Sequence, residues 1–126
     1  MNRPVKTPGP DHPIEISAAG GAFRAVCAGL VLAQSTRALA LQEARYPQVV
    51  YFPREDVDLS LLERSATISW CPYKGEASYF SMKANDVAGV AAVADVAWSY
   101  ETPPPALQGI ASYVAFYANK VVVEAA

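Results

Sequence analysis

Apolar and polar residues alternate along most of the chain, and a period of two residues is typical of half-buried β-strands. The segments with this pattern are 13–17, 23–34, 37–43, 48–52, 66–70, 77–83, 89–100 and 113–124. Ala28-Gly29 and residues 118–120 interrupt two of them, which predicts a hairpin within 23–34 and a closing hairpin within 113–124. Ten prolines, which break long helices, strengthen the β prediction.

Helical spacing appears in two short segments. Residues 57–64 carry apolar side chains at helical positions, and either Asp56 or Asp58 can cap this segment. Residues 103–110 allow one helical turn that begins at proline. We therefore expect little helix outside residues 57–64.

These elements predict a mainly β fold, in which two related antiparallel β-meanders pack together and carry one or two short helices. An internal correspondence favours two related halves, because Leu41-Gln42 aligns with Leu107-Gln108 and Tyr51 aligns with Tyr117 at the same offset. The residues expected in the core are Leu39, Val49, Tyr51, Ile68, Tyr79, Val93 and Phe116.

The composition is that of one globular domain. The chain has 126 residues, of which 52% are hydrophobic and 17% are charged, so it has enough apolar side chains for a single core. The proline-rich residues 1–10 are predicted to form an N-terminal arm, and residues 11–126 are predicted to form the domain.

Charge and motif content exclude several classes of partner. A net charge of −2 without a basic block argues against nucleic acid. The most apolar stretch, 87–98, is too short to span a membrane and contains Asp95. The first residues lack the apolar segment of a secretory signal, so we expect a soluble cytoplasmic protein with free thiols at Cys27 and Cys71. A single histidine, His12, and two separated cysteines predict neither a metal site nor a cofactor.

The densest group of chemically active side chains is CPYKGEASYFS, residues 71–81. The proline and glycine within it predict a tight turn from which Tyr73 and Lys74 project. An ammonium beside a phenol suits the anchoring of a carboxylate or phosphate, and Glu76 could pair with Lys74 or act as a base. The simpler interpretation is a surface turn with a solvated lysine.

Four other residues are candidates for the same site. Arg54 could clamp an anion with its planar guanidinium, unless it pairs with the two acidic residues that follow it. Trp98 and Tyr100 share one face of a predicted strand, where two aromatic side chains form either a core or a stacking platform. His12 could reach the site from the N-terminal segment, although a hydrogen-bonded structural histidine is the simpler interpretation.

Five segments together resemble one known family: PGPDHPI, YPQVVYFPREDV, CPYKGEASYFS, AWSYETP and YVAFY. In order from Pro8 to Val123, they resemble the small domains of domain-of-unknown-function family 427, sometimes labelled nucleotidyltransferase-like. The resemblance implies a compact, mostly β domain without an established reaction. A nucleotidyltransferase normally needs a glycine-rich phosphate loop or paired metal-binding aspartates, and the sequence shows neither pattern. The closest carboxylate pair, Asp56 and Asp58, is explained by helix capping.

Two functional hypotheses follow. In the first, a pocket between the two halves binds a small anionic or polar metabolite and supports acid–base chemistry. Its catalytic candidates are Tyr73, Lys74 and Glu76, and its ligand-binding candidates are Arg54, Trp98, Tyr100 and His12. In the alternative, the domain is a non-catalytic interaction or self-assembly module. The surface of the resulting homodimer would be formed by Tyr113, Phe116 and Tyr117.

Overall fold

The computed structural model describes residues 3–126, and within this range ten strands form three antiparallel sheets. The strands are β1 (Ile14–Ala18), β2 (Phe23–Cys27), β3 (Leu30–Ser35), β4 (Leu39–Glu43), β5 (Val49–Tyr51), β6 (Leu62–Cys71), β7 (Gly75–Met82), β8 (Val93–Tyr100), β9 (Val114–Phe116) and β10 (Val122–Ala125). The helical segments in this range are 3-10 helices, namely η1 (Arg54–Asp56), η2 (Leu59–Leu61) and η3 (Pro105–Ile110).

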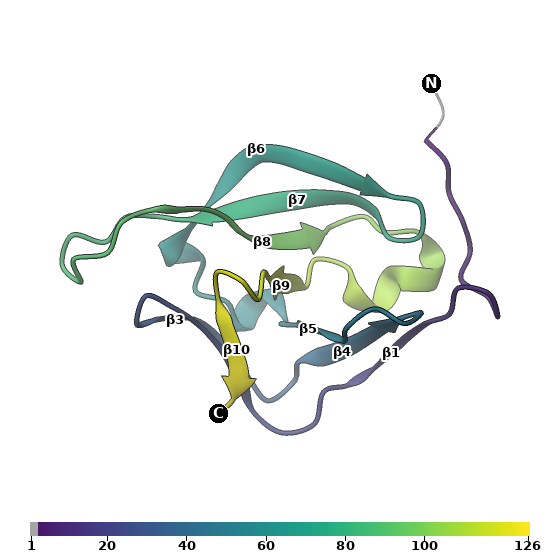
Figure 1. Cartoon of the computed structure of the whole chain (residues 1–126), viewed down its shortest axis with the longest axis horizontal. Coiled ribbons are helices and arrows are strands. Elements are labelled where there is room, and N and C mark those ends of the chain that lie inside the picture. The colour runs from purple at the N-terminus through teal and green to yellow at the C-terminus, as the bar shows by residue number, and fades with distance from the viewer. Residues whose placement is uncertain (1–2) are drawn as a thin grey trace.

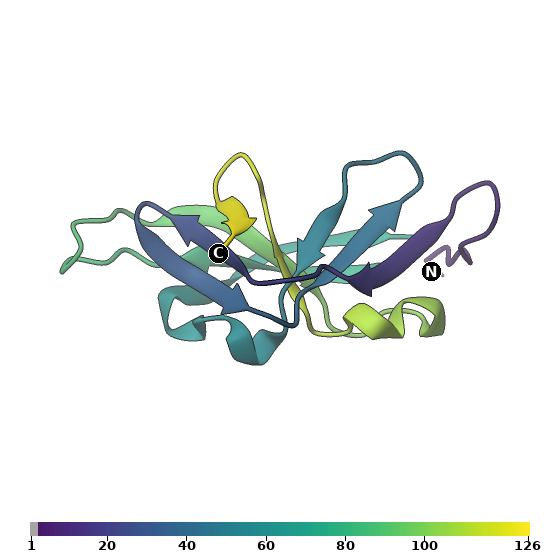
Figure 2. The same cartoon turned by 90° about the horizontal axis from the view of Figure 1, so that it is seen from below.

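The sheets form two layers. The larger sheet has the order β6-β7-β8-β9, and the two smaller sheets have the orders β1-β4-β5 and β10-β2-β3. The larger sheet lies over the two smaller ones, which sit side by side (Figures 1 and 2). The predicted mainly β, antiparallel fold is confirmed. None of the helices in residues 3–126 is long and apolar enough to cross a membrane.

Two predicted turns are confirmed by their backbone geometry. β2 and β3 form an antiparallel hairpin, and both residues of its turn, Ala28 and Gly29, have positive φ, at 51° and 82°. Positive φ at both central residues is what a type I′ hairpin turn requires. The second turn joins β6 to β7, which pair as far as Cys71 and Gly75.

Two hydrophobic clusters lie between the layers. The first contains Phe52 and Phe80, and the second contains Tyr51 and Leu107. Because successive residues of an extended segment point to opposite sides, the chain at β5 contributes Tyr51 to one cluster and Phe52 to the other.

The predicted core is correct in part. Tyr51 and Phe116 are buried, at 1% and 5% exposure. The half-buried members of the predicted set are Leu39, Val49, Tyr79 and Val93. Ile68 is 56% exposed, so its assignment to the core was wrong. It lies on β6, the edge strand of the larger sheet, and its alternation with polar neighbours does not indicate a covered face.

The predicted helix over residues 57–64 is wrong. It is reduced to the single turn η2, and Leu62 already has extended φ and ψ of −118° and 155° and pairs with Met82. The Asp58 side chain accepts a hydrogen bond from Ser60 N at 3.1 Å, which closes a local turn instead of starting a longer helix. Strand pairing buries Leu62, and this tertiary packing overrides the local helical spacing.

The predicted closing hairpin within residues 113–124 is also wrong. The chain does turn near residues 117–120, but β9 pairs with β8 whereas β10 pairs with β2. An ion pair across the β10–β2 contact joins Glu124 to Arg24 at 2.9 Å. The turn therefore connects two different sheets.

The arrangement of the two halves differs from the predicted relation. β6 to β9 do form a meander, but the N-terminal half is divided between two sheets because β1 pairs with β4 and not with β2. The aligned residues Leu41 and Leu107 lie in β4 and in η3 respectively, so the sequence correspondence aligns a strand with a 3-10 helix.

The N-terminal segment contacts the turn between β6 and β7. Lys6 N donates to Pro72 O at 2.9 Å, and Trp70 Nε1 donates to Pro4 O at 3.0 Å. The Arg3 guanidinium lies 4.9 Å from the centre of the Trp70 ring. These contacts dock residues 3–6 on the larger sheet, while the division of the chain at residue 10 stays a prediction.

We expect Gly75→Ala to lower the free energy of unfolding by about 1–3 kcal/mol, because a side chain at this backbone conformation is strained. Gly75 has φ of +93°, and an added Cβ would lie 3.4 Å from Pro104 Cδ. Urea unfolding measures the loss. Gly9→Ala is the matched control, since its Cβ would meet nothing within 4 Å. Equal stability of the two variants would contradict the structural role of Gly75.

Candidate functional site

The turn between β6 and β7 carries a lysine that forms an ion pair inside the protein. Lys74 Nζ lies 2.5 Å from Oε1 of Glu43, at the end of β4, and both side chains are only 14% exposed. The ammonium also lies 5.6 Å from the centre of the Tyr100 ring. The simpler interpretation of this stretch, a surface turn with a solvated lysine, is therefore wrong, because Glu43 neutralises the charge of Lys74 beneath the surface.

The second oxygen of the same carboxylate binds a histidine. His12 Nε2 and Glu43 Oε2 are 2.8 Å apart, and the imidazole is 25% exposed. The ring stacks on Tyr73, with centroids 4.1 Å apart and an interplanar angle of 10°. Lys74, Glu43 and His12 thus form a continuous chain of cation, carboxylate and imidazole, which we call the His12 cluster.

The environment fixes the charge of Glu43. Burial alone would raise its pKa, but hydrogen bonds from Lys74 and then from His12 outweigh this effect and hold the pKa below its ordinary value. Nearby phenols behave differently, since burial raises the pKa of Tyr51 and of Tyr100 well above the ordinary range. The result is an ionised carboxylate surrounded by neutral aromatic groups.

A cavity of about 350 Å³ opens beside the imidazole. It is lined by Asp11, His12, Ala44, Arg45 and Tyr46. The Gln42 side-chain amide holds the turn on its far side by donating to the backbone oxygens of Ala44 and Tyr46, at 3.2 and 2.6 Å. A histidine oriented by a carboxylate at the wall of a cavity can accept or deliver a proton.

Two predicted site residues lie outside this cluster. Glu76 does not pair with Lys74 and instead binds Arg3 at 2.7 Å on the exposed side of β7. Arg54 donates to Ser112 O and to Ser99 Oγ, both at 2.9 Å, and lies 3.2 Å from Glu101. Its guanidinium is therefore occupied by the protein itself.

The predicted aromatic residues divide between the cluster and the core. Tyr100 is buried, at 7% exposure, and lies beneath the Lys74 ammonium. Trp98 Nε1 donates to Tyr51 OH at 3.2 Å, and its ring packs 4.6 Å from that of Tyr117. Trp98 thus joins the second hydrophobic cluster and is not among the residues that line the cavity beside His12.

Glu43 is the residue that the sequence reasoning missed. It stands at the end of the predicted strand 37–43, where an acidic residue directly before a turn is unremarkable by itself. Its role depends on two contacts with partners 31 residues away in either direction along the chain, His12 and Lys74. Such pairing follows from the β1–β4 register and the β6–β7 turn, which local patterns do not specify.

Within residues 3–126, no group of three or more His, Cys, Asp or Glu side chains is arranged to hold a metal ion. The thiols of Cys27 and Cys71 are both free, and burial raises the pKa of Cys27.

A family model described as "Domain of unknown function (DUF427)" matches residues 15–126, in agreement with the resemblance found from the sequence motifs. No curated protein matches the chain. Glu43 and Lys74 lie inside the matched range, whereas His12 lies just before it.

We expect Lys74→Met to lower the free energy of unfolding by about 1–3 kcal/mol, because it leaves a largely buried carboxylate without its closest cation. Lys83→Met, at an exposed lysine, is the matched control and should change stability by no more than about 0.5 kcal/mol. Urea unfolding of both variants tests this. A Lys74 variant as stable as the control would show that the ion pair contributes nothing.

The lowered pKa of Glu43 predicts a loss of stability in acid. Because the unfolded chain binds this proton more readily, the contribution of Glu43 is complete above its ordinary pKa and disappears as the pH falls through the lowered value. Between about pH 5 and pH 3, Glu43→Gln should flatten the fall in unfolding free energy. Glu63→Gln, on the exposed edge strand, is the control. Identical pH profiles for wild type and Glu43→Gln would contradict the assignment.

Proposed function

We propose that this chain, which belongs to the family described as domain of unknown function 427, binds a small polar or anionic metabolite beside His12. The family description assigns no reaction, so the support comes from the residues. The observation that carries the proposal is the His12 cluster, whose imidazole edge lies at the wall of a cavity of about 350 Å³. This volume lies at the lower end of the range for small-molecule sites.

His12 is the proposed proton-transfer group. Glu43 holds one ring nitrogen, Nε2, and no other hydrogen bond within residues 3–126 reaches the imidazole side chain. The stack on Tyr73 fixes the plane of the ring. An acid or base held by a carboxylate in a defined orientation is the arrangement used in many proton-transfer sites. Lys74 supports it indirectly, by keeping Glu43 ionised.

The lining of the cavity favours a polar or anionic ligand. Arg45 is one of the lining residues, and its guanidinium suits pairing with a carboxylate or a phosphate. Tyr46, which is 62% exposed, supplies an aromatic face. Asp11 offsets part of this positive charge, so a ligand with both an anionic group and a hydroxyl or amine suits the lining better than a bare anion.

The interaction or self-assembly module remains the second proposal, and one observation favours it. β10 is an edge strand of its sheet, and its Val122 is 57% exposed, which leaves an apolar edge open to another strand. The surface expected from the sequence is less suitable, because Phe116 is only 5% exposed and already packs on Phe52. Sedimentation equilibrium of wild type and of Val122→Lys distinguishes a dimer through this edge from a monomer.

We expect a thermal-shift screen of small carboxylates, phosphates and phosphorylated alcohols to yield a compound that stabilises the wild-type protein. A ligand at about 100 times its dissociation constant adds roughly 2.7 kcal/mol, which is readily measured. His12→Asn should weaken this response at least tenfold in affinity, because it removes the imidazole at the wall of the cavity. Asp86→Asn, in an exposed loop, should leave it unchanged. A response retained in full by His12→Asn, or absent from the whole screen, would refute the proposal.

A further inference from the structure

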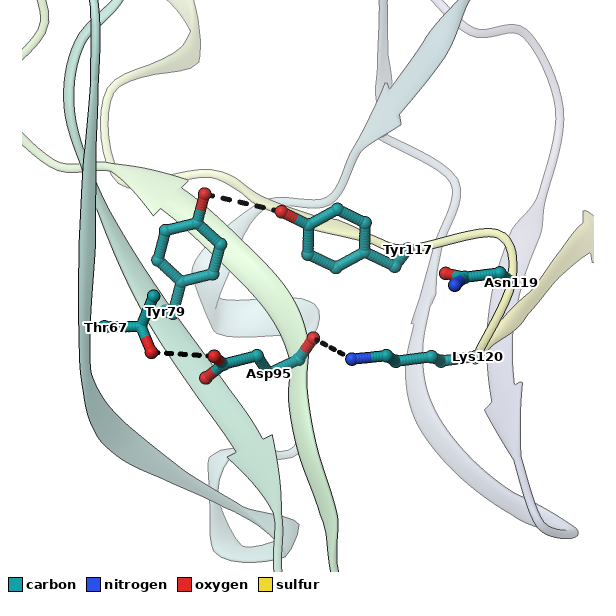
Figure 3. Close-up of a pocket in the computed structure, with 6 residues that line it drawn as sticks. All are labelled: Thr67, Tyr79, Asp95, Tyr117, Asn119 and Lys120. Carbon is teal, nitrogen blue, oxygen red and sulfur yellow. Dashed lines mark hydrogen bonds between the residues drawn. The ribbon is translucent and has the colours of Figure 1, made fainter.

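A second cavity lies on the larger sheet and shares no residue with the His12 cluster. It has a volume of about 330 Å³ and is lined by Thr67, Tyr79, Asp95, Tyr117, Asn119 and Lys120. These side chains come from β6, β7, β8 and the turn before β10, and they surround an open centre (Figure 3). We call it the Asp95 pocket.

Two irregularities in the sheet create this pocket. Between the pairs Arg64–Phe80 and Ile68–Ser78, three residues of β6 lie opposite the single residue Tyr79. Between Phe80–Ala97 and Met82–Val93, three residues of β8 lie opposite the single residue Ser81. Bulges redirect side chains and are enriched beside functional sites. Here both strands that flank β7 bulge within a few residues of each other.

Asp95 occupies a rare backbone conformation within the β8 bulge. Its φ is +46°, and its backbone N–H donates to Ser81 Oγ at 3.0 Å. An aspartate with positive φ inside a strand is uncommon and often marks a functional position. The conformation brings the carboxylate toward the opposite bulge, where the Thr67 hydroxyl donates to Oδ2 at 2.7 Å.

The pocket holds a fixed negative charge. The Ser65 and Thr67 hydroxyls lower the pKa of the Asp95 carboxyl. Oδ1 is buried and has no donor in hydrogen-bond geometry among residues 3–126, although Ser65 is close enough to affect the pKa. Oδ2 keeps a second acceptor position beyond its bond from Thr67.

The positive charge in the pocket belongs to Lys120, whose ammonium is hydrogen-bonded to the protein backbone. Lys120 Nζ donates to the backbone oxygens of Ala94 and Asp95, at 2.9 and 3.3 Å, and lies 5.8 Å from the centre of the Tyr117 ring. One of its three N–H groups is left for a ligand. A cationic ligand would be repelled by this ammonium, and a simple anion would be repelled by Asp95.

The aromatic side of the pocket is formed by Tyr79 and Tyr117. The rings of Tyr79 and Tyr117 are nearly parallel, at 12°, and their hydroxyls are 3.3 Å apart. Burial raises the pKa of Tyr117, so its phenol stays protonated. Figure 3 shows both rings on one side of the pocket, with the Asp95 and Lys120 groups on the other.

From this geometry we infer that the Asp95 pocket binds a neutral, hydroxyl-rich ring, of the class of a monosaccharide or cyclic polyol. Each hydroxyl of such a ligand both donates and accepts, which matches an acceptor at Asp95, a donor at Lys120 and both functions at the Asn119 amide. The carbon face of the ring would pack against the tyrosines. The inference does not depend on the function proposed for His12.

The test is titration of the ¹⁵N-labelled wild-type protein with D-glucose, D-galactose, D-mannose and myo-inositol. We expect at least one of them to give saturable shifts of amides in 65–67, 94–96 and 117–120, with a dissociation constant below about 50 mM. Glycine, ethylammonium and acetate are the zwitterionic, cationic and anionic comparisons. Saturation at the Asp95 pocket by one of these three instead, or by no compound, would overturn the inference.

Two variants sharpen the test. Asp95→Asn removes the charge, and because asparagine tolerates positive φ as aspartate does, the fold should persist and the affinity should fall at least tenfold. Asp86→Asn is the matched control and should bind as wild type does. Should Asp95→Asn misfold, Asn119→Ala on the exposed turn replaces it, with a loss of at least threefold expected. Unchanged affinity in the folded variant would overturn the inference.

Discussion

The two layers are joined by one pair of backbone hydrogen bonds on which the rest of the packing depends. Phe52 N donates to Val114 O at 2.8 Å, and Val114 N donates to Phe52 O at 2.9 Å. Both residues are fully buried, so these bonds are shielded from water and their loss would leave unsatisfied polar groups in the core. The bridge fixes β5 against β9, and with it the direction in which Tyr51 and Phe52 enter the two hydrophobic clusters.

Both candidate sites depend on the layering that this bridge sets. The His12 cluster needs β4 from a small sheet and the β6–β7 turn from the large one, since Glu43 meets Lys74 only where the layers meet. The Asp95 pocket needs the turn at 117–120, which leaves the large sheet to reach β2. In both places, charged side chains are held by partners far away along the chain, which makes their positions sensitive to the global fold.

The strands were predictable because a period of two residues is a local signal, and the segments 23–34 and 37–43 that carry it correspond to β2, β3 and β4. The predictions failed where pairing with a segment distant in the sequence determines the local structure. Leu62 pairs with Met82 in spite of helical spacing, and β10 pairs with β2 in spite of the adjacent β9. The turn that carries Lys74 could be predicted from its proline and glycine, but the pairing of Lys74 with Glu43 could not. The positive φ of Asp95 could not be predicted either. No short pattern encodes a register shift in a neighbouring strand.

The pairing of β10 with β2 also has a consequence for synthesis on the ribosome. Arg24 and Glu124, which bind each other across this pair, are separated by 100 residues. The β2–β3 hairpin therefore leaves the exit tunnel long before its third strand, and β2 presents an unpaired edge during that interval. An unpaired edge is a template for pairing with other strands, so the β2 edge is a site of aggregation during translation until β10 covers it.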